Sequence, residues 1–354
     1  MKMKKALFMA AAVIACAGAA SASTPETTST DSGFKIDGEV RLRYRVDRNT
    51  NNQFGNGTYN GTRGVLLLNM SQKLDKHLGL YARYSYVNAP DELTNNYAAD
   101  VVEGGHNHYS TIDQYGLTYK NGNWNYKVGA QNLTLGATGL LYDDTRYFGR
   151  HIMTQAINAN GKIGKVAVNG ILAKSNYDSD YENDKIFYVH GSLPVNRSTY
   201  GLGYARVNYG DDTAAAKVED GKTGMNYYTA DFSYKLTDNT FFHSEFIKSS
   251  ASDNNNGVNL VLFHIFDAKN NGGIAWFRVE GQAGIQQRTE GNMTYQWGNA
   301  QGYGVFFNHK INKDLTFSFT DFEMKQIDTL TFPHNPSGMP GDQNTMRIDL
   351  TYKF

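Results

Sequence analysis

The stretch "TMRIDLTYKF" (residues 345–354) alternates strictly between two kinds of side chain. One set is apolar or aromatic and comprises Met346, Ile348, Leu350, Tyr352 and Phe354. The residues between them are polar or charged. Successive side chains of a β-strand point to opposite faces of the sheet, so this period of two predicts a strand with one apolar and one polar face.

The same period occurs in "FKIDGEVRLRYRV" (residues 34–46). Its apolar face contains Phe34, Ile36, Val40, Leu42, Tyr44 and Val46, and its polar face contains Lys35, Asp37, Glu39, Arg41, Arg43 and Arg45. The pattern recurs along the chain and predicts an all-β protein of about sixteen strands. We place them near residues 34–48, 64–74, 78–89, 112–120, 124–132, 151–160, 165–176, 185–193, 199–209, 225–236, 240–250, 258–266, 273–285, 300–311, 315–328 and 345–354.

The connections between these strands alternate between short and long. The short ones are mostly rich in Asn, Asp and Gly, as tight hairpins require, and lie at 75–77, 121–123, 161–164, 194–198, 237–239, 267–272 and 312–314. The longer ones lie at 49–63, 90–111, 133–150, 177–184, 210–224, 251–257, 286–299 and 329–344. This alternation predicts an antiparallel up-and-down meander with both of its ends on the short-turn side.

Composition narrows the class of protein. The formal net charge is zero and the pI is about 7.1, which gives no indication of nucleic-acid binding. Mean hydropathy is −0.53, yet 13% of the residues are aromatic. Beyond the N-terminal segment, no stretch reaches the ~18 consecutive apolar residues of a transmembrane helix. A helical membrane protein is therefore excluded, whereas one made of strands is not.

A membrane protein made of strands fits the remaining features. Backbone groups in lipid cannot bond to water, so a sheet that crosses a membrane must close on itself. Such barrels combine strands of about 10 residues, short turns at one end, longer loops at the other and aromatic girdles at both interfaces. Aromatic residues lie near the predicted strand ends here, for example Tyr81, Trp124, Tyr126 and Phe241. We predict a transmembrane β-barrel, with a soluble exported all-β protein as the alternative.

The N-terminal stretch "MKMKKALFMAAAVIACAGAASAS" predicts export. It has a basic start, an apolar run and an Ala-Ser-Ala ending at Ala22, which is typical of a signal peptide at residues 1–22. Residues 23–33 then form a polar tail that we expect to be disordered, and residues 34–354 form the barrel. Lipidation of Cys16, the single cysteine, is the alternative to cleavage after Ala22.

In its strand count, alternating turns and terminal strand with aromatic–x–aromatic at its end, the chain resembles the trimeric sixteen-stranded porins of Gram-negative outer membranes. The resemblance implies that the last strand pairs with the first and serves as a signal for barrel assembly. It also implies a homotrimer, contacts with outer-membrane lipid and lipopolysaccharide, and passive diffusion of small polar solutes and ions. No cofactor, metal or nucleic acid is expected.

Arginines identify the inner face of the predicted barrel. Alternate arginines are too costly to place in lipid, so Arg41, Arg43 and Arg45 are expected to line the lumen, with Arg83 and Lys127 in the same phase. The resemblance implies that the third long loop (132–150) folds inward and carries acids that face this basic cluster. Its charged residues for the constriction are Asp143, Asp144 and Arg146. The Pro-Glu-Phe-Gly-Gly stretch that those porins often carry in this loop is absent.

Alternatives remain for these residues and for the function. Asp143 and Asp144 are otherwise solvated loop charges, and the arginines otherwise form a salt-bridged wall without a role in selectivity. The arginine row also fits an anion-preferring, substrate-specific channel. A barrel that does not conduct would act as an adhesin or structural anchor through loops such as 90–111 and 329–344. An enzyme is not indicated, because the consecutive His243 and Ser244 point to opposite faces of a strand and cannot pair.

Overall fold

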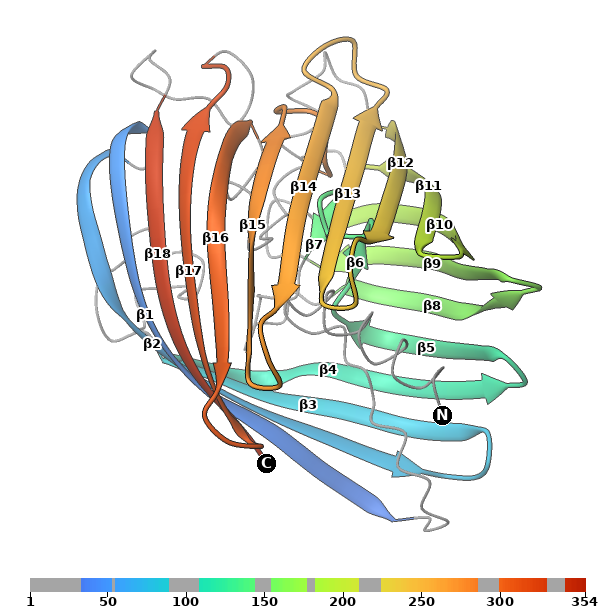
Figure 1. The fold of residues 1–354 in the computed structure, drawn as a ribbon. Helices are drawn as coiled ribbons and strands as arrows, with labels where there is room; N and C mark the ends of the chain where they lie inside the picture. The colour runs from blue at the N-terminus through green and yellow to red at the C-terminus, as the bar shows by residue number, and fades with distance from the viewer. Residues whose placement is uncertain are drawn as a thin grey trace.

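The computed structural model describes residues 33–52, 55–88, 108–143, 154–176, 182–209, 224–285, 299–329 and 341–354. Within these ranges sixteen antiparallel strands close into one barrel (Figure 1). Its first half comprises β1 (Phe34–Asn52), β2 (Gly55–Lys73), β3 (Leu78–Asn88), β4 (His108–Asn121), β5 (Trp124–Gln131), β8 (Thr154–Ile163), β9 (Val166–Asn176) and β10 (Glu182–Val195). The second half comprises β11 (Ser198–Asn208), β12 (Gly224–Lys235), β13 (Thr240–Ser249), β14 (Asn256–Ile265), β15 (Asn270–Val279), β16 (Ala300–Lys310), β17 (Leu315–Gln326) and β18 (Asp342–Lys353).

The predicted class, the number of barrel strands and their up-and-down order are confirmed. One connection is wrong, because the loop expected at 49–63 is largely strand. There β1 and β2 continue as one long hairpin whose register extends to Asn49 opposite Gly57. The stretch is polar and rich in Gly and Asn, which are poor strand formers. Pairing with β18 on the other side, as far as Thr50 opposite Asp342, overrides this weak propensity.

The barrel closes where β1 meets β18. Their register runs from Glu39 opposite Lys353 to Thr50 opposite Asp342. The seam continues beyond the register, since the Gly38 N–H donates to the Phe354 carbonyl at 2.9 Å and the Phe354 N–H donates to the Gly38 carbonyl at 3.1 Å. The terminal alternating strand therefore completes the ring and leaves no unpaired edge.

Several short turns share one device, an Asx side chain that caps the backbone. The Asp75 carboxylate accepts the N–H groups of His77 and Leu78 at 2.6 and 2.7 Å. Asp267 and Asn312 accept two backbone N–H groups in the same way in their own turns. The hydrogen bonds from the backbone of His77 and Leu78 lower the pKa of Asp75. These residues account for the Asn- and Asp-rich turns seen in the sequence.

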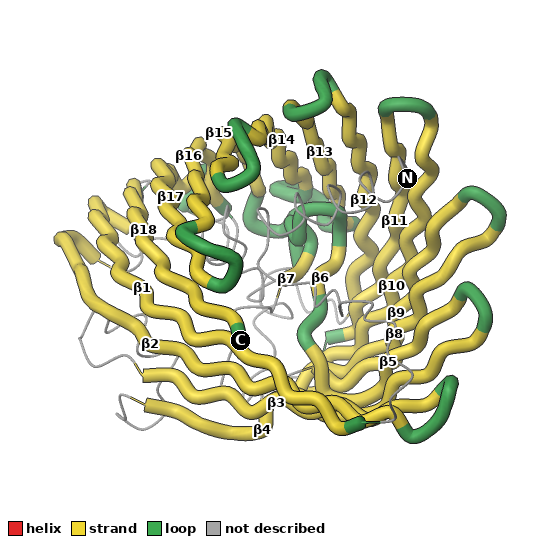
Figure 2. Tube along the Cα trace, turned by 60° about the horizontal axis from the view of Figure 1, so that its bottom comes forward, coloured by secondary structure: helices red, strands yellow, loops and turns green. Residues whose placement is uncertain are grey.

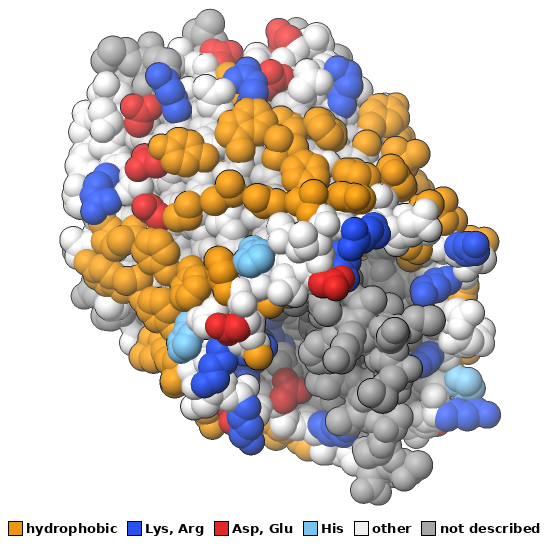
Figure 3. Space-filling model, in the orientation of Figure 1, with side chains coloured by type: hydrophobic (Ala, Val, Ile, Leu, Met, Phe, Trp, Pro, Cys, Tyr) orange, Lys and Arg blue, Asp and Glu red, His pale blue; other side chains and the backbone are white. Residues whose placement is uncertain are grey.

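The two faces of the wall differ as the alternation predicts. The outward-facing set includes large apolar side chains that are strongly exposed, such as Leu202 (72%), Tyr303 (62%) and Leu42 (58%). Figure 3 shows that such side chains gather in a broad band over the visible outer face, with charged side chains toward its edges. Among the described residues, no helix is long and apolar enough to cross a membrane.

Candidate functional site

A small hairpin lies inside the ring of strands (Figure 2). It consists of β6 (Thr134–Leu135) and β7 (Tyr142–Asp143), which pair antiparallel between β5 and β8 in the sequence. It belongs to the third long loop, which was expected to fold inward. The prediction contained no strands at this position, because two-residue elements show no periodicity.

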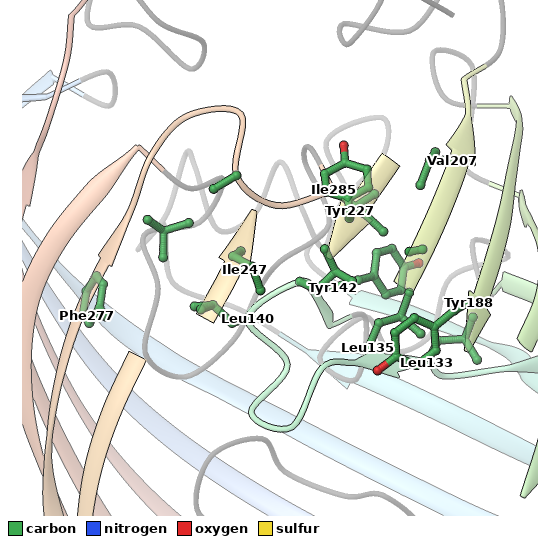
Figure 4. Packing of buried hydrophobic residues seen from close by; sticks show 14 of the residues in the cluster. Leu133, Leu135, Leu140, Tyr142, Tyr188, Val207, Tyr227, Ile247, Phe277 and Ile285 are labelled. Atoms are coloured by element: carbon green, nitrogen blue, oxygen red, sulfur yellow. The ribbon is translucent and has the colours of Figure 1, made fainter. Parts of the chain in front are cut away.

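The hairpin is held in the interior by apolar packing. Its buried side chains are Leu133, Leu135, Leu140, Leu141 and Tyr142, each at most 2% exposed. They belong to one cluster with wall residues such as Tyr188, Tyr227 and Ile247, seen from close by in Figure 4. Full burial of a leucine side chain contributes about 1.5–3 kcal/mol. The hairpin is therefore a fixed part of the interior.

Hydrogen bonds from the barrel wall also hold the tip of the hairpin, and we call this set of hydrogen bonds the latch. Glu245, on the inner face of β13, is fully buried and its Oε2 accepts the backbone N–H of Thr138 at 2.6 Å and the Thr138 hydroxyl at 2.5 Å. Asn259 of β14 donates its side-chain N–H to the same hydroxyl oxygen at 3.0 Å. The Gly136 N–H donates to the Tyr188 hydroxyl at 3.0 Å. Strands β10, β13 and β14 thus all bind the tip of the hairpin.

Glycine is required where the hairpin meets Glu245. Gly136 has a φ of 88°, a conformation that L side chains rarely adopt. A Cβ at this position would also overlap Oε1 of Glu245. The close approach of backbone and carboxyl group therefore depends on the absence of a side chain.

The opposite side of the ring carries a row of arginines. By strand order, β1 lies across the barrel from the strands that hold the hairpin. The Arg43 guanidinium binds the Asp349 carboxylate through two hydrogen bonds of 2.6 and 2.9 Å, and Arg45 binds Asp47 at 2.7 Å. The bidentate geometry is the strong form of this interaction and fixes the plane of the guanidinium. It also ties β1 to β18 on the lumen side of the seam.

The other predicted basic residues are placed as follows. Arg41 pairs with Glu39 on its own strand. Arg83 binds Asp113 through two hydrogen bonds of 2.8 Å. Lys127 lies over the Tyr81 ring, with its Nζ 4.3 Å from the ring centroid. Each named arginine is therefore paired with a carboxylate, which is the arrangement of a salt-bridged wall.

The predicted loop charges are only partly within the structure. Asp143 is fully buried at the end of β7, opposite Thr134 in the hairpin. Asp144 and Arg146 lie outside the described residues. Within the described part of the chain, no group of three or more His, Cys, Asp and Glu side chains forms a metal-binding arrangement.

Two further arginines complete this wall. Arg63 stands opposite Arg43 on β2, and Arg347 stands opposite Arg45 on β18. The alternation in "TMRIDLTYKF" already places Arg347 on the polar face, but its position beside Arg45 depends on the register of the closed seam. We call the inward-facing arginines of strands β18, β1, β2 and β3 the arginine wall. They are Arg41, Arg43, Arg45, Arg63, Arg83 and Arg347.

Asp113 is a residue that the sequence did not indicate. The register between β3 and β4 shifts between Arg83 and Tyr84, so that an extra residue, Asp113, lies on β4. Such a bulge redirects a side chain, and here it brings a carboxylate to both Arg83 and the Ser85 hydroxyl. A bulge interrupts the period of two without leaving a sequence signal of its own.

Comparisons with known proteins support the fold. No family model and no curated protein matches the chain. It is similar to solved structures of a Rhodopseudomonas blastica porin triple mutant, at 9% identity and a TM-score of 0.53, covering 91% of this chain and all of that one. The chain is also similar to the structure of a loop deletion mutant of OmpT, an outer membrane protein of Vibrio cholerae. That match has 10% identity and a TM-score of 0.53, and it covers 92% of this chain and all of that one. The chain thus has the porin-like fold, and these low identities show the fold alone.

Proposed function

We propose that this protein is an outer-membrane porin, which forms a water-filled channel for passive diffusion of small hydrophilic solutes and ions. The observation that carries the proposal is the closed sixteen-stranded barrel, with an apolar band outside and the arginine wall inside. A barrel of this size leaves an aqueous channel rather than a core filled by side chains. The solved structures to which the chain is similar, a porin and an outer membrane protein, support the proposal because they share this fold.

The interior suggests how solutes would be selected. The hairpin narrows the barrel from one side, and the arginine wall with its carboxylates lies on the other. Charges fixed across a narrow aqueous gap favour hydrated polar solutes over apolar ones. We assign Arg41, Arg43, Arg45, Arg83, Lys127, Asp143, Asp144 and Arg146 to this constriction. Transport is passive and involves no cofactor or covalent chemistry.

The proposal extends to export and assembly. Residues 1–22 would be removed as a signal peptide, and the outward apolar band would contact outer-membrane lipid and lipopolysaccharide. The porin-like architecture supports a homotrimer.

An anion-preferring channel is the second candidate. It is favoured by Arg63 and Arg347, which stand directly beside Arg43 and Arg45 and concentrate positive charge on neighbouring strands. A specific channel of this kind would be blocked by its own substrate at low concentration, whereas a general porin would not.

Single-channel recording of the mature protein in a planar bilayer tests the function. We expect large openings in steps of three. In a salt gradient, replacement of Arg41, Arg43 and Arg45 by glutamine should shift the reversal potential toward cation preference, because Glu39, Asp47 and Asp349 lose the arginines that neutralise them. A Lys76→Gln variant, altered in an exposed turn, should behave as the parent. A folded barrel that never conducts would contradict the proposal.

A further inference from the structure

Four basic side chains lie on adjoining parts of the outer surface, at the end of the barrel that carries the longer loops. They are Lys174 on β9, Lys185 on β10, Arg206 on β11 and Lys248 on β13. Lys174 is directly opposite Lys185. On the same face, Arg206 stands opposite Phe187 of β10 and Asn226 of β12, and Lys248 stands opposite Tyr228 of β12. We call this group the basic rim.

The basic rim borders the apolar band. Two residues closer to the middle of the wall, on the same outward face, stand Leu172 (55% exposed), Phe187 (43%) and Phe246 (52%). Leu202 on β11 is 72% exposed, so this sector presents a wide apolar surface directly beside the cations. A molecule that covers both surfaces must carry an apolar part and a negatively charged end.

The charge of the basic rim is not balanced within the described structure. No described residue forms a hydrogen bond or ion pair with Lys174 or Lys185, although like charges directly opposite in a sheet are unfavourable. The Arg206 guanidinium donates only to the amide oxygens of Asn208 and Asn226, both at 3.1 Å. Lys248 donates only to the amide oxygens of asparagines 255 and 256, at 3.3 and 3.1 Å.

The rest of the same edge has mixed charges. On β15, Arg278 forms an ion pair with Glu280, with Nη2 and Oε1 3.3 Å apart. On β17, Lys325 stands opposite Asp342 of β18, and the outward-facing Glu323 is two residues away. Among the described residues of β9–β13, one acid, Glu182, takes an outward register position at this edge, opposite Asn176, against the four cations of the basic rim. The excess of positive charge is therefore specific to one sector.

We propose that the basic rim binds the phosphate group of an anionic lipid headgroup, in the leaflet that lies on the long-loop side. This inference rests on the proposed insertion of the barrel into a membrane. Basic side chains at the edge of an apolar surface attract anionic headgroups, and their aliphatic stems pack on apolar neighbours while the charge stays in the headgroup layer. The exposed Leu202 and Phe187 would contact the acyl chains. This apolar contact favours a lipid phosphate over free phosphate.

Titration of the detergent-solubilised mature protein with lipid, followed by native mass spectrometry, tests this site. We expect dioleoylphosphatidic acid to bind more tightly than either dioleoylphosphatidylcholine or inorganic phosphate. Replacement of Lys174, Lys185 and Lys248 together by glutamine should weaken phosphatidic acid binding about 100-fold, from roughly fivefold for each charge. The Lys325→Gln variant removes a cation from the same edge in the mixed sector and should bind as the parent does.

Lipid binding and channel conductance are measured independently of each other. The basic rim faces away from the lumen, so the triple variant should keep the parent's single-channel conductance. Unchanged lipid affinity in the triple variant, or an equal loss in Lys325→Gln, would overturn the headgroup site. Equal affinity for inorganic phosphate would overturn the lipid as the ligand. A parent that binds phosphatidic acid at the basic rim but never conducts would retain this site while contradicting the porin.

Discussion

Replacing Glu245 by alanine is expected to loosen the internal hairpin and to convert uniform channel openings into fluctuating ones. The Thr138 N–H and hydroxyl both donate to the Glu245 carboxyl group, at 2.6 and 2.5 Å, in a site without exposure to solvent. A buried donor that loses its acceptor costs about 1–3 kcal/mol. Two such losses cost about 2–6 kcal/mol, whereas burial of the four leucines of the hairpin contributes about 6–12 kcal/mol. The tip should therefore detach while the apolar packing keeps the hairpin in the interior.

The measurement is single-channel noise and mean conductance of the open state. Because a detached tip samples several positions in the constriction, Glu245→Ala should show additional conductance levels. Glu245→Gln keeps an oxygen acceptor at the same place and is the matched control, for which we expect the parent's single level. Indistinguishable traces from both variants would mean that the latch does not position the hairpin.

Gly136→Ala tests the same contact from the other side. A methyl group there would overlap Glu245 Oε1, and the φ of 88° is unfavourable for alanine. The variant should therefore show the same additional levels as Glu245→Ala. If the two substitutions are combined, the second should add little, since each breaks the same contact.

Replacing Gly38 by valine is expected to abolish closure of the barrel, which is the largest effect that we predict. A Cβ at this position would stand 2.7 Å from the Leu67 carbonyl oxygen and within the space of the Phe354 ring. The substitution would displace the last residue from the seam, where Gly38 and Phe354 exchange two backbone hydrogen bonds. Each backbone group left unsatisfied in lipid costs several kcal/mol, so an open seam cannot be tolerated there.

The fraction of folded barrel after refolding into detergent, measured by heat-dependent gel mobility, checks this prediction. Gly170→Val is a matched control, because Gly170 lies on the outer face of β9 and a Cβ there would meet nothing within 4 Å. It should fold as the parent does. Removing the ring with Phe354→Ala should partly rescue Gly38→Val, although the contact with the Leu67 carbonyl remains. Normal folding of Gly38→Val would show that the seam tolerates a wider spacing.

Local alternation made much of the fold predictable. The residues of "FKIDGEVRLRYRV" and "TMRIDLTYKF" occupy the faces that a period of two assigns to them, with Leu42 and Leu350 outward and Arg43 and Asp349 inward. The inward placement of the arginines followed from the cost of charge in lipid. The extent of β1 and β2 was missed, because a polar, glycine-rich stretch reads as a loop until its partner strands are known.

The site depended more strongly on contacts between distant parts of the chain. Glu245 and Thr138 are 107 residues apart, and Arg43 and Asp349 are 306 residues apart. The bulge at Asp113 and the seat of the hairpin against β10, β13 and β14 have no periodic signal. None of these pairs and positions can be predicted from the sequence of a single strand.

The amino-acid sequence by itself determined the class of fold, the number of barrel strands and the side of the wall on which each alternating residue lies. These properties follow from the geometry of an individual strand, which is local. Only the tertiary structure decided the register of the seam, the carboxylate that each arginine binds and the place where the hairpin is latched. These contacts depend on strand pairing and on closure of the ring, which set the surroundings of each side chain and bring residues that are distant in the sequence together.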